Sequence, residues 1–299
     1  MDRPTVRLNP NADKRLRAGH PWAFSNEIRM SPEYRAWERG MPVKLESAEG
    51  WRYGTFMFNP HSLIAARLLD RNPEAEIDAA WVGHRIARAA SLRARLVDPR
   101  FHRLVHAEAD GLPGLVVDRY GDVAVVQANT AGMDRLLPDI TAALVGQLGL
   151  RAVVARNDSA AREQEGLVQE IRLLHGTDAA TENEEGGVVF AIDPLGGQKT
   201  GFFHDQRPNR AMVASLAKGA RVLDVFCHVG AFGLGCAKAG AKEVVLVDSS
   251  APALEQALAA AASTGLAGVS AKRGDAFDVM AELAQAGEKF DIVVVDPPA

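Results

Sequence analysis

Four aspartates in the last third of the sequence each follow or end an apolar run. They lie in the segments RVLDVF, EVVLVD, AKRGDAF and FDIVVVDPP, and they are Asp224, Asp248, Asp275 and Asp296. Carboxylates can accept hydrogen bonds from ribose hydroxyls and from exocyclic amines, and they stabilise a nearby positive charge. For any single one of them, ordinary turn chemistry, which favours Asp, is the simpler interpretation. Four in order indicate a ligand site.

The glycines after the first run argue against a dinucleotide. Gly230, Gly233 and Gly235 give the order G-x-x-G-x-G, whereas NAD-binding loops use G-x-G-x-x-G. Asp248 is placed to hold both hydroxyls of a ribose. A ligand with adenine, ribose and a positive charge but no phosphate suits this ring of carboxylates, and S-adenosylmethionine is such a ligand. We therefore predict it as the cofactor.

Two further segments could contribute to the same site. After Asp296, two prolines impose a rigid, extended exit from the strand, next to which a planar amino-bearing base could be held. Upstream, GGQKTGFFHDQR (196–207) concentrates charge around two aromatic rings, but it lacks the glycine that a phosphate loop places before its lysine. Its residues are instead candidates to pair with the methionyl carboxylate and to sandwich a base: Lys199, Phe202, Gln206 and Arg207.

Two basic segments suggest contact with RNA. Near the N-terminus, Lys14, Arg15, Arg17 and His20 lie close to Trp22, which mixes phosphate-binding charge with a surface on which a base can stack. Residues 84–103 contain six arginines, Arg85 and Arg88 among them, against the single acid Asp98. A solvated arginine face beside an aromatic core is the alternative. The net charge of −4 does not decide between the two, because local charge sets such a footprint.

The elements that must position these residues fall into three stretches. Residues 1–76 have short apolar runs and turn signals typical of a small β-rich module. Residues 77–182 combine helical spacing over 77–97, a hairpin turning at Tyr120-Gly121-Asp122, a helix over 134–148 and the strand RAVVARN, which is an α+β pattern. Residues 176–187 are polar and are the best candidate for a linker.

Residues 183–299 change to an alternation of strand and helix. We expect strands at Arg221–Phe226, Glu243–Asp248, Val269–Gly274 and Phe290–Asp296, with helices at 231–239, 251–263 and 276–287. Ser249 or Ser250 can cap the second helix. Nearly continuous apolar strands alternating with helices predict an α/β fold with a doubly wound parallel sheet. In such sheets ligands bind beyond the carboxyl ends of the strands, where the four aspartates stand.

Composition excludes several other classes. The chain has 299 residues, 47% hydrophobic and 24% charged, which describes an ordinary globular protein. No apolar run is long enough for a transmembrane helix, and the N-terminus lacks the apolar core of a secretory signal. Cys227 and Cys236 are too few for a disulfide framework, and His102 and His106 lack a third ligand for a metal. We expect a cytoplasmic protein without a metal or a membrane partner.

Taken together, these motifs resemble the bacterial 23S ribosomal RNA large subunit methyltransferase I family, cytosine-C5 methyltransferases with an N-terminal PUA domain. The likeness spans the chain through HPWAFSNEI (20–28), EADGLPGLVVDRYG (108–121), GQKTGFFHDQR (197–207), FCHVGAF (226–232), VDSS (247–250), RGDAF (273–277) and VVDPP (294–298). It implies a PUA-like RNA-binding barrel, an α+β middle domain and a Rossmann-like class I methyltransferase sheet that uses S-adenosylmethionine, with large-subunit ribosomal RNA as the partner.

The resemblance also implies roles for individual residues. Asp296 would face the methyl group and the base as the catalytic residue. The cofactor would be lined by residues at the strand ends and supported by the upstream loop: Asp224, Phe226, Gly230, Asp248, Ser249, Asp275 and Ala276, with Lys199, Phe202, Gln206 and Arg207.

One departure from the family concerns the nucleophile. In the family the reactive cysteine follows a later strand, after Asp-Pro-Pro, whereas this sequence stops at Ala299. Cytosine C5 needs a thiolate adding to C6 before it can attack a methyl group. We therefore expect a chain that is incomplete at its C-terminus, with an uncovered sheet edge, and that lacks C5 methyl transfer. Two alternatives stay open: a guanine N-methyltransferase, which needs no cysteine, and a non-catalytic RNA-binding module. A homodimer is also left open.

Overall fold

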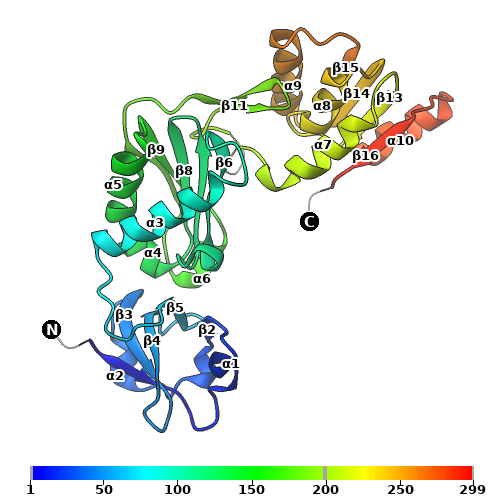
Figure 1. Cartoon of the computed structure of the whole chain (residues 1–299). Helices are drawn as coiled ribbons and strands as arrows, with labels where there is room; N and C mark the ends of the chain where they lie inside the picture. Colours follow the sequence, from blue (N-terminus) through cyan, green and yellow to red (C-terminus); the bar gives the residue numbers. More distant parts are fainter. Residues whose placement is uncertain (1–2, 198–200, 298–299) are drawn as a thin grey trace. The chain divides into compact units, whose positions relative to one another are not determined.

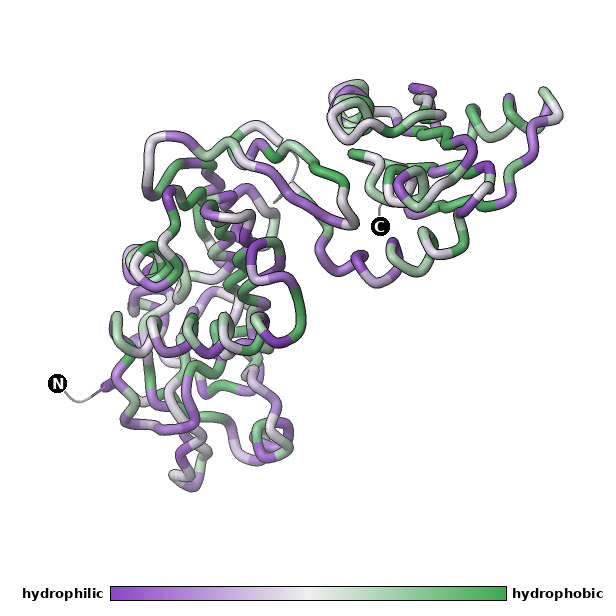
Figure 2. Tube along the Cα trace, turned by 45° about the horizontal axis from the view of Figure 1, so that its top comes forward, coloured by the Kyte–Doolittle hydropathy of each residue, from purple (hydrophilic) through white to green (hydrophobic). Residues whose placement is uncertain are grey.

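The computed structural model describes residues 3–197 and 201–297, and it forms two compact units (Figure 1). The first unit runs to Ala179 and includes a short return of the chain from Asp193. The second comprises Ala180–Ile192 and the chain from Gly201 onward. Figure 2 shows hydrophobic segments alternating with hydrophilic ones along the trace of both units.

The first unit begins with a five-stranded sheet in the order β1-β3-β4-β5-β2. Its strands and short helices are β1 (Thr5–Arg7), α1 (Lys14–Arg17), β2 (Trp22–Ala23), the 3-10 turn η1 (Ser25–Glu27), α2 (Pro32–Arg35), β3 (Met41–Glu46), β4 (Arg52–Phe58) and β5 (Ala66–Asp70). Fully buried side chains such as Leu45, Phe56 and Phe58 fill its core. The expected β-rich module therefore has its own core.

Five further strands and four helices complete the described part of the first unit. They are α3 (Ala79–Arg93), β6 (Phe101–His106), the 3-10 turn η2 (Ala107–Asp110), β7 (Leu115–Tyr120), β8 (Val123–Ala128), α4 (Ala131–Arg135), α5 (Leu137–Leu148), β9 (Ala152–Asn157), α6 (Ala161–Glu165) and β10 (Glu170–His175). The sheet order is β10-β9-β8-β7-β6, and the β8–β9 pair is parallel while the other pairs are antiparallel. This is the α+β pattern expected from the sequence.

The core of this second sheet lies against α3 and α5. Val82 and Ile86 of α3 and Ile140 and Leu144 of α5 are fully buried in the same cluster as residues of β6–β8. Asp78 caps α3 by accepting the N–H of Trp81 at 2.8 Å. The helix ends at Arg93, before the Asp98-Pro99 stop that the sequence suggested. The helix expected over 134–148 is two helices, α4 and α5.

The expected linker at 176–187 is wrong over most of its length. Thr181–Glu185 forms β11, which pairs antiparallel with β12 (Val188–Ile192) in a hairpin that turns at Gly186-Gly187. Low apolar content concealed this strand, because polar residues occupy its inward positions: Asn183 is fully buried and Glu185 is partly buried. Polar content alone therefore did not identify a linker.

The rest of the second unit is a four-stranded sheet in the order β15-β14-β13-β16, with every pair parallel. Its elements are the 3-10 turn η3 (His204–Gln206), α7 (Arg207–Ser215), β13 (Arg221–Val225), α8 (Ala231–Lys238), β14 (Glu243–Asp248), α9 (Ala251–Ser263), β15 (Val269–Arg273), α10 (Ala276–Gln285) and β16 (Ile292–Val295). The α/β prediction is confirmed, and the strands and helices fall within a few residues of the expected positions.

Helices cover both faces of this parallel sheet. On one face Leu223 and Val245 pack against Val279 and Leu283 of α10. On the other, a Cβ at Gly233 of α8 would come within 2.9 Å of Val244, so the helix and β14 are in close contact. The order of the strands reverses between β13 and β16, the place where ligands bind in doubly wound sheets. None of the helices in the described ranges is long and apolar enough to cross a membrane.

Candidate functional site

The loop between β13 and α8 leaves the strand end in an unusual conformation. Phe226 and His228 both have positive φ angles, 62° and 51°, and Gly230 has a φ of 75°. Positive φ is rare for residues with a Cβ and is concentrated where surrounding structure enforces it, often at ligand sites. The loop is tied to the neighbouring strand, because the N–H of Cys227 donates to the carbonyl of Val247 at 3.1 Å.

Asp248, at the end of β14, fastens that loop. Its Oδ2 accepts the N–H of His228 at 2.8 Å, and its Oδ1 accepts the N–H of Ser250 at 2.9 Å. Each carboxylate oxygen offers two lone pairs, so each retains one for another donor. Ser250, rather than Ser249, caps α9, and the exposed Ser249 accepts Arg273 through its carbonyl.

Asp224 is the buried member of the group. Its Oδ2 accepts the N–H of Gly233 at 2.8 Å, and the residue is 1% exposed. Burial, followed by the charges of Asp296 and Asp248, raises the pKa of Asp224 to about 7. The carboxylate is therefore a support for the glycine-rich turn rather than a group in contact with solvent.

The third strand end presents an aromatic side chain. Asp275 caps α10 by accepting the N–H groups of Phe277 and Asp278, so its Oδ1 is already engaged. Ala276 is buried against the sheet. Phe277 is 71% exposed and meets Phe226 edge to face, with ring centroids 6.3 Å apart. Sequence reasoning did not single out this exposed ring.

Asp296 follows β16 directly and is exposed. Its backbone N–H donates to the carbonyl of Val225 at 3.4 Å, which places it beside the end of β13. The first and fourth strand ends, which are neighbours in the sheet, thus bring Asp224, Phe226 and Asp296 to one edge.

The upstream loop is organised around Glu185, a residue that sequence reasoning missed. Phe202 is buried against Phe190, and its exposed neighbour Phe203 meets His228 edge to face at 5.9 Å. Arg207 donates to Glu185 at 3.1 Å, while Gln206 accepts an amide N–H of Asn209. Lys199, predicted for the same loop, lies outside the described residues. No alternation of apolar and polar residues in Thr181–Glu185 marks Glu185 in the sequence.

Neither cysteine has the environment of a nucleophile. Cys227 and Cys236 are both buried. Burial, reinforced by the charges of Asp224 and Asp248, raises the pKa of the Cys227 thiol far above its usual value. Burial and the charge of Asp224 raise the pKa of Cys236 to about 11. Both thiols are therefore protonated at neutral pH.

The predicted N-terminal RNA residues form a surface cluster in which several are already paired. Arg15 lies over the Phe24 ring at 4.2 Å and pairs with Glu27, and Arg17 pairs with Asp13 at 2.7 Å. His20 meets Trp22 edge to face. The Trp22 indole N–H donates to Glu108 at 2.7 Å, and Lys14 is exposed. The half-buried Trp22 ring is thus anchored at its polar end.

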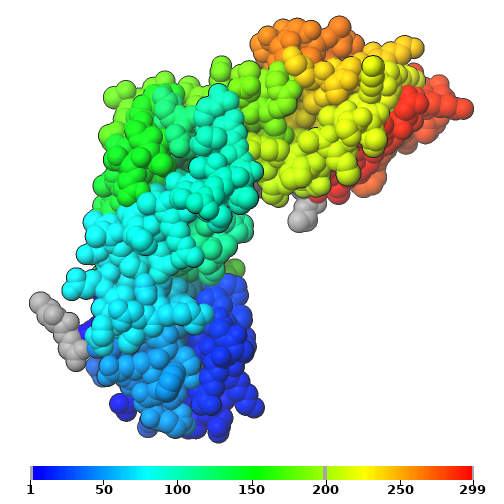
Figure 3. Space-filling model, in the orientation of Figure 1, coloured from blue at the N-terminus to red at the C-terminus, as the bar shows by residue number. Residues whose placement is uncertain are grey.

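The arginine-rich segment around α3 is mostly neutralised. Four of its six arginines form ion pairs, namely Arg85–Asp70, Arg93–Asp110, Arg100–Asp98 and Arg103–Asp118. Arg88 and Arg95 have no ion-pair partner within residues 3–197 and 201–297. Both line a cavity of about 510 Å³ between α3 and η2. Figure 3 shows α3, in cyan, on the visible face of the first unit.

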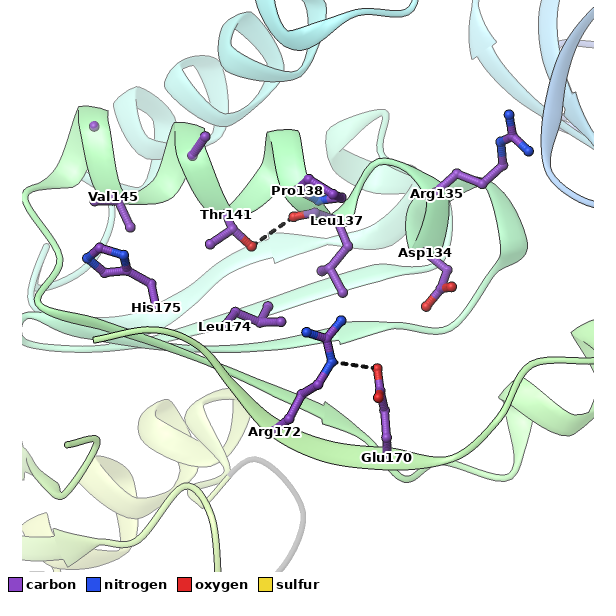
Figure 4. Close-up of a pocket in the computed structure, with 12 residues that line it drawn as sticks. Asp134, Arg135, Leu137, Pro138, Thr141, Val145, Glu170, Arg172, Leu174 and His175 are labelled. Atoms are coloured by element: carbon purple, nitrogen blue, oxygen red, sulfur yellow. Dashed lines mark hydrogen bonds and ion pairs between the residues drawn. The ribbon is translucent and has the colours of Figure 1, made fainter. Parts of the chain in front are cut away.

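A larger cavity, of about 680 Å³, lies between α5 and the edge strand β10 (Figure 4). Leu137, Val145 and Leu174 contribute apolar walls, and Arg172, paired with Glu170, and His175 contribute polar ones. Of the predicted cofactor residues that the structure describes, none lines this cavity. It is therefore separate from the site at the strand ends.

Comparison with known proteins agrees with this architecture. Residues 6–71 match a PUA-like domain family, and residues 209–299 match a family described as conserved hypothetical protein 95. A putative SAM-dependent methyltransferase from Streptococcus mutans superposes with a TM-score of 0.81 at 20% identity, covering 99% of this chain and 77% of that one. A putative methyltransferase complexed with SAH gives 0.82, also at 20% identity, over 100% and 76%. The fold is that of the Rossmann-like, SAM-dependent methyltransferases with a PUA-like domain.

Sequence relatives narrow the class. Ribosomal RNA large subunit methyltransferase I of Shewanella frigidimarina is 38% identical over an alignment of 300 positions, which covers 98% of this chain and 75% of the relative. The protein of the same name from Tolumonas auensis is 35% identical over an alignment of 305 positions, which covers 98% of this chain and 76% of that one. The chain belongs to the ribosomal RNA large subunit methyltransferase I family.

Proposed function

We propose that this protein binds S-adenosylmethionine at the strand ends of its parallel sheet and methylates large-subunit ribosomal RNA. The observation that carries the cofactor assignment is Asp248. Its carboxylate is fixed by two backbone N–H groups at 2.8 and 2.9 Å and keeps one lone pair on each oxygen. A fixed, doubly accepting carboxylate is what a ribose with two adjacent hydroxyls requires.

The neighbouring residues fit the rest of the ligand. The exposed Phe277 ring offers a stacking surface for adenine, and Asp275 and Asp296 supply carboxylates at the adjoining strand ends. Seven further residues are proposed members of the pocket or of its supporting loop: Phe226, Gly230, Ser249, Ala276, Phe202, Gln206 and Arg207. When bound, S-adenosylmethionine supplies an electrophilic methyl group on a sulfonium. Asp296 is our proposed residue at the reacting base.

Support for the RNA substrate comes from the first unit and from the relatives. The relatives are named as ribosomal RNA methyltransferases, and residues 6–71 match a PUA-like domain. The exposed cations Lys14 and Arg88 are the proposed phosphate contacts with the fewest competing partners among the described residues. We propose that five further residues contact the RNA beside Lys14 and Arg88: Arg15, Arg17, His20, Trp22 and Arg85. Because the proposed substrate is ribosomal RNA, we propose that the reaction takes place in the cytoplasm. A homodimer is a separate proposal, which sedimentation of the purified protein tests.

Cytosine C5 is the proposed target atom, on the strength of the family resemblance. This chemistry requires a thiolate, and the buried thiols of Cys227 and Cys236 do not supply one. A guanine amine is the alternative, because its methylation needs no covalent intermediate. The burial of both thiols is the specific observation that favours this alternative.

The cofactor assignment is tested by calorimetry with S-adenosylhomocysteine and its 2′-deoxy analogue. If Asp248 accepts ribose hydroxyls, the wild-type chain should bind the deoxy analogue about 10- to 100-fold more weakly, as expected for a lost hydrogen bond to a charged group. Asp248→Ala should lose that discrimination, whereas the exposed Asp278→Ala on α10 should retain it. Equal discrimination by wild type and Asp248→Ala would overturn the assignment, even if the variant binds both ligands more weakly.

The target is tested by digesting methylated RNA to nucleosides. Unmodified large-subunit RNA is incubated with methyl-labelled S-adenosylmethionine and either the 299-residue chain or the protein from its native host. Label in 5-methylcytidine supports C5 transfer, and label in a methylguanosine supports the alternative. If both preparations bind RNA but neither transfers label, the result would indicate a non-catalytic RNA-binding module. If the Cys227→Ala and Cys236→Ala variants still form 5-methylcytidine, neither of these cysteines supplies the thiolate.

A further inference from the structure

An ion-pair cluster joins the β11–β12 hairpin to the loop beside the strand-end site. Arg210 of α7 donates to both carboxylate oxygens of Glu185, from Nε at 2.5 Å and from Nη2 at 2.9 Å. Arg207 donates to the same carboxylate at 3.1 Å. The side chains of Glu185 and Arg210 are 13% and 6% exposed, so the pair is shielded from water. Such two-point pairing fixes the orientation of a guanidinium.

Arg210 also contacts Phe203 and so helps to hold it in place. Its Nη2 also donates to the Phe203 carbonyl at 2.8 Å, and its guanidinium lies over the Phe202 ring at 4.7 Å. The guanidinium is also 5.9 Å from the ring of Phe232, at the start of α8. One side chain therefore contacts the hairpin, the upstream loop and the helix that follows the glycine-rich turn.

Phe203 links Arg210 to His228, which contacts Asp248, the residue proposed to bind the ribose. Its ring, 45% exposed, meets the His228 ring edge to face with centroids 5.9 Å apart. The backbone N–H of His228 donates to Asp248. A continuous path of contacts thus runs from Glu185 through Arg210, Phe203 and His228 to Asp248.

The charge of Glu185 is maintained by its partners. Burial by itself would raise the pKa of this carboxyl, but the hydrogen bonds and charges of Arg210 and Arg207 outweigh burial and lower it. The folded protein therefore favours the ionised form of this carboxyl. The hydrogen bonds of this shielded carboxylate go to guanidinium groups, so its influence on the strand ends passes through the residues that those groups orient.

We propose that Glu185, acting through Arg210 and Phe203, is a positioning residue for the cofactor pocket. This inference rests on the proposed function, since the pocket is the one assigned to S-adenosylmethionine. Removing the charge of Glu185 should release the Arg210 guanidinium. The rings of Phe203 and His228, which we propose as a wall of the cofactor pocket, would then lose their fixed position. Misplacement of a pocket wall commonly costs one or two orders of magnitude in binding or rate, and we expect about a tenfold loss of affinity.

The test is a double-mutant cycle with S-adenosylhomocysteine, measured by calorimetry on the 299-residue chain. Glu185→Gln and Phe203→Leu should each weaken binding about tenfold, and the double variant should be no weaker than either, because both act through one contact. Glu182→Gln, an exposed glutamate on the same strand, is the matched control and should bind like the wild type. Arg210→Lys keeps the charge but not the fork, and it should lose as much as Glu185→Gln.

The outcomes separate this inference from the proposed function. No binding of S-adenosylhomocysteine by the wild type would overturn the proposed cofactor itself. Wild-type binding with unchanged affinity in Glu185→Gln, or losses that multiply in the double variant, would overturn only the positioning role. If Glu185→Gln does not fold, Phe203→Leu and Arg210→Lys complete an equivalent cycle, because the Phe203 side chain is partly exposed and Arg210→Lys retains the cation.

Discussion

Replacing Asp224 with Asn should make the stability of the second unit less dependent on pH. The carboxyl is buried beneath the glycine-rich turn, and its pKa is raised to about 7 by burial and then by the charges of Asp296 and Asp248. In the unfolded chain the same group has a pKa near 3.8. Asn keeps an oxygen for the N–H of Gly233 but carries no charge at any pH.

The sign and size of the effect follow from proton linkage. Between pH 4 and 7 the folded state holds a proton that the unfolded state has released, so wild-type stability falls as pH rises. Each pKa unit corresponds to about 1.4 kcal/mol, and the difference between about 7 and 3.8 therefore amounts to about 4 kcal/mol. From pH 5 to pH 8, Asp224→Asn should gain about 3 kcal/mol relative to wild type, with no further gain above pH 8.

The assay must report on the second unit alone. All four tryptophans, Trp22, Trp37, Trp51 and Trp81, precede Ala180, so their fluorescence follows the first unit. Hydrogen exchange of peptides from β13, β14 and α8, corrected for intrinsic exchange rates, measures the local free energy of opening. Peptides from β7 and β8 serve as the internal control. A difference between variant and wild type that stays flat from pH 5 to 8, or that falls, would refute the reasoning.

Three other predictions address the turn, the RNA surface and the hairpin. Gly230→Ala should destabilise the second unit by about 1–3 kcal/mol, seen by the same exchange measurement, because φ is 75° there and a Cβ would lie 3.0 Å from Leu246 of β14. Arg88→Ala and Arg95→Ala should each reduce the slope of log affinity against log salt for RNA by about 1, while paired Arg100→Ala should change it less, as measured by fluorescence anisotropy. Asn183→Leu should stabilise the hairpin by about 1–2 kcal/mol in exchange or thermal melts, because neither polar atom of this buried amide has a hydrogen-bond partner among the described residues.

Local pattern was enough to predict the parallel sheet and its ligand-bearing edge. The strand Glu243–Asp248 has the predicted limits, because a run of buried valines and leucines between helices has few other solutions. The topology of a parallel sheet brings strand ends together whatever the loops do, so the sequence alone predicts Asp224, Asp248 and Asp296 at one edge. Their individual roles as ligands remain predictions.

Contacts between distant segments could not be predicted in this way. Glu185 and Arg210 are 25 residues apart, and no local spacing relates a strand of a hairpin to the face of a later helix. The sequence also did not show which of two adjacent rings is buried, because no local pattern distinguishes Phe202, which packs against Phe190, from the exposed Phe203. Similarly, local composition marked six arginines around α3 and the nearby Asp98, but not the three more distant aspartates that pair with Arg85, Arg93 and Arg103.

The pKa values of two carboxyl groups of the second unit, the partly buried Glu185 and the buried Asp224, are shifted in opposite directions, and the contrast bears on what the pocket binds. Glu185 lies between two guanidinium groups, which lower its pKa although it is partly buried. Burial, reinforced by the charges of Asp296 and Asp248, raises the pKa of Asp224 despite the N–H that Gly233 donates to it. The excess negative charge therefore lies at the strand ends, and Arg210, already committed to Glu185, offsets little of it. A ligand that brings its own positive charge to this edge would relieve the repulsion, whereas a phosphate would add to it. Among the described residues, the charges of Asp248 and Asp296 thus favour a ligand that carries a positive charge.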